Sequence, residues 1–149
     1  MHLIPFSFEH LELFDWREEE RGRYDTGSEF TRRLCLAAED PEVFRAHTLV
    51  HDGRILVVGG VFKVSEKTGR AWTIFSRHAG VMPLSAARRV RREFKEIVAA
   101  LGLHRVETLN LADRAAHHKW CEWLGFVFEG RAPKYDDAGR DYARYGLVL

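Results

Sequence analysis

The stretch RRVRREFKEIVAALG, residues 88–102, decides the fold class more than any other part of the sequence. Its apolar side chains recur at helical spacing: Val90, Phe94, Ile97, Val98 and Leu101. Charged side chains fill the other faces, and Gly102 is the residue type that commonly ends a helix. The pattern therefore predicts a long amphipathic helix whose apolar face packs on a core and whose arginines form a solvated face.

Strand patterns stand on both sides of this helix. Residues 71–75 before it and 106–111 after it are apolar and β-branched, and a strand, helix, strand order implies parallel pairing through a right-handed crossover. A last helix is predicted from Asp113, as its cap, to Gly125. Its buried stripe is Ala116, Trp120, Trp123 and Leu124. Residues 127–131 and 142–149 then form a final hairpin around a loop at 136–139.

The first half of the chain predicts two short helices and a hairpin. Residues 3–8 fit a strand and 9–16 a helix, and Thr26 with Glu29 forms a capping box for a second helix that ends near Ala38. Residues 47–50 and 54–64 form a hairpin around Asp52-Gly53. Within its second strand, Gly59-Gly60 indicates a bulge or a close backbone approach. The acidic run 18–20 is expected on the surface.

Composition limits the class of protein. The chain has 149 residues, 46% hydrophobic and 30% charged, which suits one domain spanning residues 1–149. The net charge is +1, so no global field favours nucleic acid. Two cysteines are too few for a disulfide framework, and no run approaches the ~20 apolar residues of a membrane span. We therefore expect a cytoplasmic protein with free thiols.

The second half carries a resemblance to a known family. Residues 120–126, WCEWLGF, followed by Glu129-Gly130, are similar to the helix-to-strand signature of the GNAT acyltransferase superfamily. The order of the expected elements also resembles that family along the whole chain. Within the superfamily, the sequence looks most like the short members of tailed phages, some of which are internal virion proteins. The resemblance implies an α/β (α+β) fold with a mixed, mostly antiparallel sheet, a splayed central strand pair and flanking helices.

The resemblance also implies a cosubstrate, acetyl-CoA or another acyl-CoA, and no metal. In the family the thioester lies between the splayed strands, and the pyrophosphate rests on amides at the start of the long helix. The family loop Q/R-x-x-G-x-G/A falls on Met82, Ser85 and Ala87, and a second possible frame is residues 77–82. The positions implied for cofactor binding are Ile74, Phe75, Ser76, Met82, Ser85, Ala86, Ala87, Arg88 and Arg114. The amide of Phe75 or of Ser76 is the expected oxyanion donor.

The catalytic groups depart from the family pattern. Cys121 stands where many GNAT enzymes have a tyrosine that protonates the CoA thiolate, and its side chain is shorter by a whole ring. The general base has no fixed position in the family, which leaves four candidates here: His51, Glu107, His78 and Asp113. The pair His117-His118 is a poor metal site, because adjacent helical residues point about 100° apart.

Two functions compete at this point. One is an N-acyltransferase that acts on a small-molecule or protein amine, as a monomer or a homodimer. The other is a GNAT-fold protein that has lost transfer chemistry and serves in assembly, for example in a phage virion. Fold alone does not choose between them.

Overall fold

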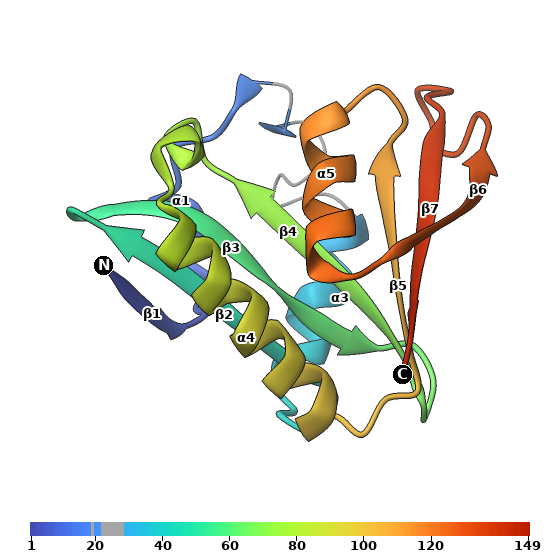
Figure 1. Ribbon diagram of the computed structural model, residues 1–149, viewed down its shortest axis with the longest axis horizontal. Helices are drawn as coiled ribbons and strands as arrows, with labels where there is room; N and C mark the ends of the chain where they lie inside the picture. Colours follow the sequence, from blue (N-terminus) through green and yellow to red (C-terminus); the bar gives the residue numbers. More distant parts are fainter. Residues whose placement is uncertain (19, 22–28) are drawn as a thin grey trace.

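The sheet is built as the strand patterns predict. The computed structural model (Figure 1) describes residues 1–18, 20–21 and 29–149. Within these residues, strands form one sheet in the order β1-β2-β3-β4-β5-β7-β6. The strands are β1 His2–Pro5, β2 Phe44–His51, β3 Arg54–Lys63, β4 Thr68–Phe75, β5 Arg105–Leu111, β6 Val127–Ala132 and β7 Tyr142–Val148. Neighbours run antiparallel except β4 and β5, which are parallel, so the sheet is mixed and mostly antiparallel.

Helices cover both faces of the sheet. They are α1 Glu9–Glu12, α3 Glu29–Ala37, α4 Leu84–Ala100 and α5 Ala115–Leu124, with a 3₁₀ turn at Ala79–Val81. Figure 1 shows α4 and α5 on one face and α1 and α3 on the other. The packing agrees, because Leu34 of α3 clusters with Trp72 and Ile74 of β4, whereas Phe94 of α4 clusters with Val61 and Val106 from the other face.

The amphipathic helix predicted from residues 88–102 is confirmed as part of α4. It buries Phe94, Ile97 and Val98 against the sheet, and Gly102 follows it with a φ of +63°. Most of its arginines are exposed, and Arg92 pairs with Glu96 one turn later at 3.9 Å. The helix therefore holds its position through one apolar face, and its charge is largely solvated.

The parallel strands β4 and β5 pair over a short stretch and then diverge. Their register is Thr68 with Arg105, Gly69 with Val106, and Arg70 with Glu107. Beyond Arg70, β4 continues to Phe75 beside β3, while β5 continues beside β7. Figure 1 shows the two arrows diverging toward their tips, with the start of α5 above the opening. The splayed strand pair expected from the sequence is present.

The glycine pair in β3 marks a close approach of strands. A Cβ atom on Gly60 would collide with the carbonyl oxygen of Arg45 and with Ala46 on β2. The register shift between β2 and β3 lies elsewhere, at Leu49 and Val50. Of the two interpretations that the sequence allows for Gly59-Gly60, the structure supports close approach.

Several expected boundaries are wrong. The first strand ends at Pro5, because Phe6 and Phe8 turn inward to pack beside Trp72 and Phe14. The helix after it ends at Glu12, two residues before Phe14, which is buried in the same cluster. The second helix ends at Ala37 as expected, but Thr26 of its capping box lies outside the described residues. Asp113 is not the cap of α5. Arg114 occupies that position and makes no side-chain cap hydrogen bond.

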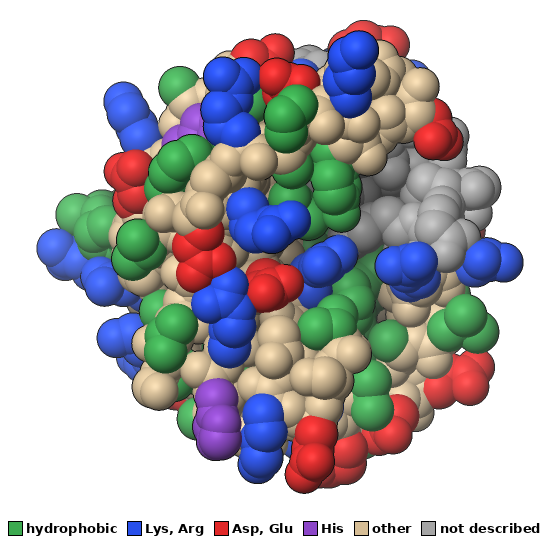
Figure 2. Space-filling model, turned by 90° about the vertical axis from the view of Figure 1, so that its right-hand side faces the viewer, with side chains coloured by type: hydrophobic (Ala, Val, Ile, Leu, Met, Phe, Trp, Pro, Cys, Tyr) green, Lys and Arg blue, Asp and Glu red, His purple; other side chains and the backbone are tan. Residues whose placement is uncertain are grey.

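The edge formed by β6 and β7 carries mixed charge. Figure 2 shows Lys and Arg side chains interspersed with Asp and Glu on this face. Arg105 of β5 binds Glu107 at 3.0 Å and also both carboxylate oxygens of Glu129 on β6, which lowers the pKa of Glu129. Acidic partners thus neutralise basic side chains locally on this face. Of the helices in the described ranges, none has both the length and the apolar character to cross a membrane.

Candidate functional site

A cavity of about 380 Å³, here named the outer cavity, lies between the start of α4, the turn before it, and α5. Small side chains and aromatic rings line much of it, with two cations at its edge. The lining residues are Arg17, Phe75, Ala79, Gly80, Leu84, Ala87, Ala116, His117, Lys119, Trp120 and Trp123. The site therefore combines room, apolar walls and positive charge.

A much smaller space, the inner cavity, lies deeper in the opening between β4 and β5. It has a volume of about 20 Å³ and shares Phe75, His117 and Trp120 with the outer cavity. The Phe75 ring lies 5.5 Å from the ring of His117 and 5.4 Å from that of Trp120, centroid to centroid. All three rings therefore lie where the two spaces meet.

The opposite face of the sheet is also hollow at this point. A groove of about 430 Å³ is lined in part by Ala71 and Thr73 of β4 and by Thr108 and Asn110 of β5. The same four residues line the inner cavity. The diverging strands therefore leave a site that can be approached from both faces of the sheet.

Backbone donors point into the opening from β4. The N–H of Ser76 donates to the carbonyl oxygen of Leu56 on β3 at 2.9 Å, so it is occupied. Because donors alternate along an antiparallel strand, the N–H groups of Phe75 and Thr73 face away from β3, toward β5. Of the two amides expected to bind an oxyanion, only that of Phe75 is oriented for the task.

The start of α4 presents a second set of amides. Pro83 is the N-cap and makes no side-chain cap hydrogen bond. Ala86 makes the first bond of the helix, to the Pro83 carbonyl at 2.9 Å, so the amides of Leu84 and Ser85 precede it. Such amides, at the positive end of the helix dipole, suit an anion.

Both sequence frames for the phosphate loop contribute to this cavity. Ala87 comes from the first frame and Gly80 from the second. Met82 packs instead on a core cluster, and Ala86 is fully buried in the same cluster. Ser85 is exposed, and the positive-φ residues other than glycine in the described ranges are Asp52 and Lys134, so Ser85 needs no glycine-like conformation.

The remaining predicted binding residues lie around the site and not on its walls. Ile74 points to the opposite face of the sheet, into the cluster around Trp72. Arg88 is exposed on the second turn of α4. Arg114 is the N-cap of α5, with its Nε 3.7 Å from a carboxylate oxygen of Asp113.

The structure separates the candidate bases from the opening. His51 is the last residue of β2, and β3 lies between β2 and the strand β4 that borders the opening. Its Nε2 lies 3.6 Å from a carboxylate oxygen of Asp52. Glu107 stands at the last paired position of β4 and β5, tied to Arg105 at 3.0 Å and to Arg70 at 3.8 Å.

The other two candidates face elsewhere. His78 binds Asp15 at 2.7 Å, and this hydrogen bond lowers the pKa of the Asp15 carboxyl. Asp113 has an 85% exposed side chain.

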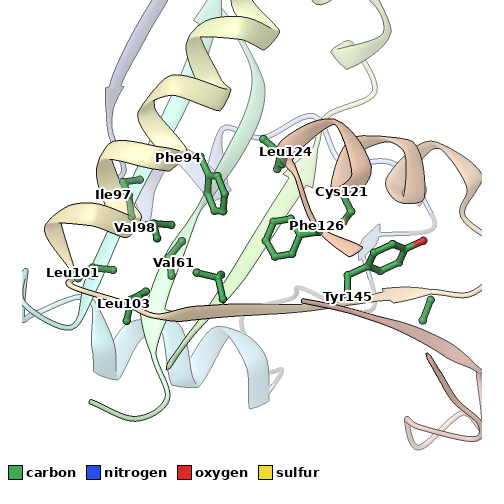
Figure 3. Close-up of a cluster of buried hydrophobic side chains, with 12 residues drawn as sticks. Val61, Phe94, Ile97, Val98, Leu101, Leu103, Cys121, Leu124, Phe126 and Tyr145 are labelled. Atoms are coloured by element: carbon green, nitrogen blue, oxygen red, sulfur yellow. The ribbon is translucent and has the colours of Figure 1, made fainter. Parts of the chain in front are cut away.

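Cys121 does face the inner cavity. Its Sγ accepts a hydrogen bond from Asn110 Nδ2 at 2.9 Å, and Figure 3 shows the side chain pointing from α5 into the core, between Phe126 and Tyr145. Burial raises the pKa of the thiol to about 11, although the Asn110 bond opposes the shift. The thiol is therefore protonated at neutral pH and reluctant to release its proton.

This burial predicts a large difference in thiol reactivity. At pH 8 only about one Cys121 thiol in a thousand is ionised, whereas Cys35 is exposed. We expect a disulfide reagent such as DTNB to release one equivalent of thiolate from the native protein, and two after unfolding. The Cys35→Ser variant should release almost none until it unfolds. Rapid release of two equivalents from native protein would contradict the burial of Cys121.

Sequence reasoning missed a buried pair at this site. Glu20, expected on the surface, has only 3% of its area exposed, and its Oε1 lies 3.5 Å from Nε2 of His117. His117 is 7% exposed and lines both cavities. A signal was present, because His117 lies one turn before Cys121 and therefore shares its helix face.

A third missed residue is Arg17. Its guanidinium lies 5.9 Å from the centre of the Phe75 ring, and its Nε donates to the Ser76 carbonyl at 3.0 Å. A short bridge between Trp16 and Ser76, with the Arg77 N–H bonded to Asp15, holds this segment against the end of β4. Arg17 and Lys119 thus place two positive charges at the outer cavity.

Comparison with known proteins shows likeness in structure only. No protein-family model matches the sequence, and no curated protein matches it either. Ard1 from Thermoplasma volcanium has a TM-score of 0.72 at 15% identity, over 99% of this chain and 97% of that chain. The spermidine/spermine N-acetyltransferase SpeG from Vibrio cholerae has a TM-score of 0.67 at 12% identity, over 99% and 91%.

A third solved structure carries the family name. An acetyltransferase of the GNAT family from Streptococcus pneumoniae has a TM-score of 0.63 at 15% identity, over 81% of this chain and 76% of that chain. Identities this low establish a shared architecture and leave substrates open. With its seven-stranded sheet, its splayed β4–β5 pair and its flanking helices, the chain has the fold of the GNAT N-acetyltransferases.

Proposed function

We propose that this protein is an N-acyltransferase that transfers an acetyl group from acetyl-CoA to an amine. The observation that carries the proposal is the position of the outer cavity, with uncapped amides at the start of α4 on one side and the opening between β4 and β5 below. A phosphate needs donors and positive charge, and a thioester needs a narrow apolar slot beside them. The site offers both.

The residues present fit acetyl-CoA in two respects. The amides of Leu84 and Ser85, with Arg17 and Lys119, would hold the phosphates. Ala87 and Gly80 leave room for a chain to pass close to the backbone. When bound, acetyl-CoA supplies an activated acyl group.

The chain's own groups would then act on the acyl transfer. The Phe75 N–H, facing the opening, would donate to the carbonyl oxygen as negative charge develops there. The groove on the opposite face of the sheet gives an amine access to the same carbon from the other side. Direct attack by a positioned amine needs no covalent enzyme intermediate.

The alternative is a catalytically silent protein of this fold, such as the internal virion proteins that the sequence resembles. The loss of the family's loop glycine and tyrosine favours it, and the three rings that narrow the opening agree. Such a protein would be found in the virion, whereas the enzyme would be cytoplasmic.

Acetyl-CoA binding separates the two functions. By mass action, a ligand at 100 times its Kd stabilises the folded state by about 2.7 kcal/mol. We expect acetyl-CoA to raise the melting temperature and to give micromolar binding by isothermal titration calorimetry. Absence of any shift at ~1 mM acetyl-CoA would overturn the enzyme proposal, since the expected stabilisation follows directly from binding. Spermidine, a peptide α-amine and a lysine side chain are the first amines to test as acceptors.

A further inference from the structure

His117 differs from the other titratable groups of the site in where it lies. Of the described residues, it is the one titratable side chain that lines both the outer and the inner cavity. Its ring packs against Phe75 at 5.5 Å, the residue whose N–H faces the opening. A group at this boundary is next to both ends of a thioester that passes from one cavity to the other.

The partner of His117 is unusual for so small a protein. Glu20 is 3% exposed, and a buried carboxylate is costly unless a cation or a proton accompanies it. Nε2 of His117, 3.5 Å away, can supply either. If Nε2 donates to this carboxylate, its proton stays on that nitrogen, and Nδ1 is the nitrogen left to accept a proton. The chain thus places a buried carboxylate against the one histidine that lines both cavities.

We propose that His117, positioned by Glu20, is the proton-transfer group of this site. The inference rests on the proposed acyltransferase function. It assigns to His117 the protonation of the CoA thiolate, for which Cys121 is poorly suited. A thiol with a pKa of about 11 gives up its proton with difficulty, and its Sγ is already an acceptor for Asn110. An imidazole exchanges protons readily near neutral pH.

In the proposed reaction, His117 both accepts the proton from the amine and returns it to the thiolate. The amine nitrogen forms a bond to the thioester carbonyl carbon, and neutral His117 takes the proton that the nitrogen loses. The carbon–sulfur bond then breaks, and the imidazolium returns that proton to the departing thiolate. The products are an amide and a thiol, and His117 ends neutral, as it began.

Other charged groups around His117 would affect its titration. Arg17 and Lys119 line the outer cavity with it, and both oppose an imidazolium. Cys121 lines the inner cavity, and His118 lies next in the helix, bonded to Tyr145 at 2.9 Å. Among the described residues, Glu20 is an acidic side chain in contact with His117, so its removal should disfavour the imidazolium.

The test compares His117→Gln and Glu20→Gln with His104→Gln, a matched change at an exposed histidine immediately before β5. Acetyl-CoA binding is measured first for each protein by calorimetry. Acetyl transfer to the best acceptor amine is then measured between about pH 5 and pH 8, where an imidazole titrates.

We expect all three variants to keep acetyl-CoA affinity within about threefold, since no interaction with the phosphates is removed. His117→Gln should lower the turnover rate by about 10²- to 10⁴-fold and abolish the fall in rate at low pH. Glu20→Gln should move the midpoint of that fall to lower pH by about one unit. His104→Gln should behave as the parent protein.

A second measurement needs no variant and no turnover. The ring Cε1–H signal of His117 in the parent protein should shift when CoA binds, and shift much less with desulfo-CoA, which has no sulfur to contact. If acetyl-CoA binds but the pH profile of His117→Gln matches that of the parent, or both ligands shift the signal equally, the role of His117 is refuted while the acyltransferase proposal stands. If acetyl-CoA does not bind the parent protein, both proposals fall.

Discussion

Replacing Ala87 with tryptophan should abolish acetyl-CoA binding. Ala87 lies in the first turn of α4 and lines the outer cavity together with Trp120 and Trp123. An indole at this position would fill the space that a pantetheine chain needs, and it would cover the amides at the start of the helix. We expect the affinity measured by calorimetry to fall by at least about 100-fold, or ~2.7 kcal/mol.

The matched control is Ala100→Trp at the exposed last residue of the same helix. It adds the same indole far from the cavity and should leave the affinity unchanged. Circular dichroism of both variants should report a native fold, because Ala87 is only partly buried. Normal acetyl-CoA binding by Ala87→Trp would show that the cosubstrate does not occupy the outer cavity.

Replacing Phe94 with alanine should cause the largest loss of stability. The Phe94 ring is 8% exposed, and it joins α4 to the sheet beside Val61 and to Phe126, whose ring centre is 5.6 Å away (Figure 3). Truncation of a buried phenylalanine costs about 3–5 kcal/mol, through lost burial and the cavity that remains. Urea denaturation should show this decrease in the free energy of unfolding with an unchanged m-value.

Val148→Ala serves as the comparison, because Val148 is 73% exposed at the end of β7. Its free energy of unfolding should stay within about 0.5 kcal/mol of the parent value. A loss below about 1 kcal/mol for Phe94→Ala would mean that α4 packs on the sheet less closely than the structure shows.

The elements with strong periodicity could be predicted from the sequence. Residues 88–102 carry their apolar side chains on one helical face, and the strands on either side are too apolar to be surface loops. Helix α4 and strands β4 and β5 therefore follow from hydrophobic pattern alone. The prediction failed where tertiary packing overrides local preference. Phe6 and Phe8 leave the strand expected for them because both rings pack into the cluster around Trp72.

The site was predictable in outline and not in its charged groups. Ala87 and Cys121 reach the two cavities because a helix start and a helix face fix their directions. Glu20 could not be placed in this way. It belongs to a charged stretch without apolar periodicity, and the contact that it makes is with His117, a residue distant in sequence. Contacts of this kind form only when the chain is folded, and the spacing of residues along the sequence does not indicate them.

The hydrogen-bond donors of the candidate site are main-chain N–H groups. The donors that face the opening belong to the backbone of Phe75 and of the first residues of α4, so they persist whichever side chains occupy those positions. A substitution at Ser85 would therefore leave these amides where they are, because their positions follow the path of the main chain and not the identity of the side chain.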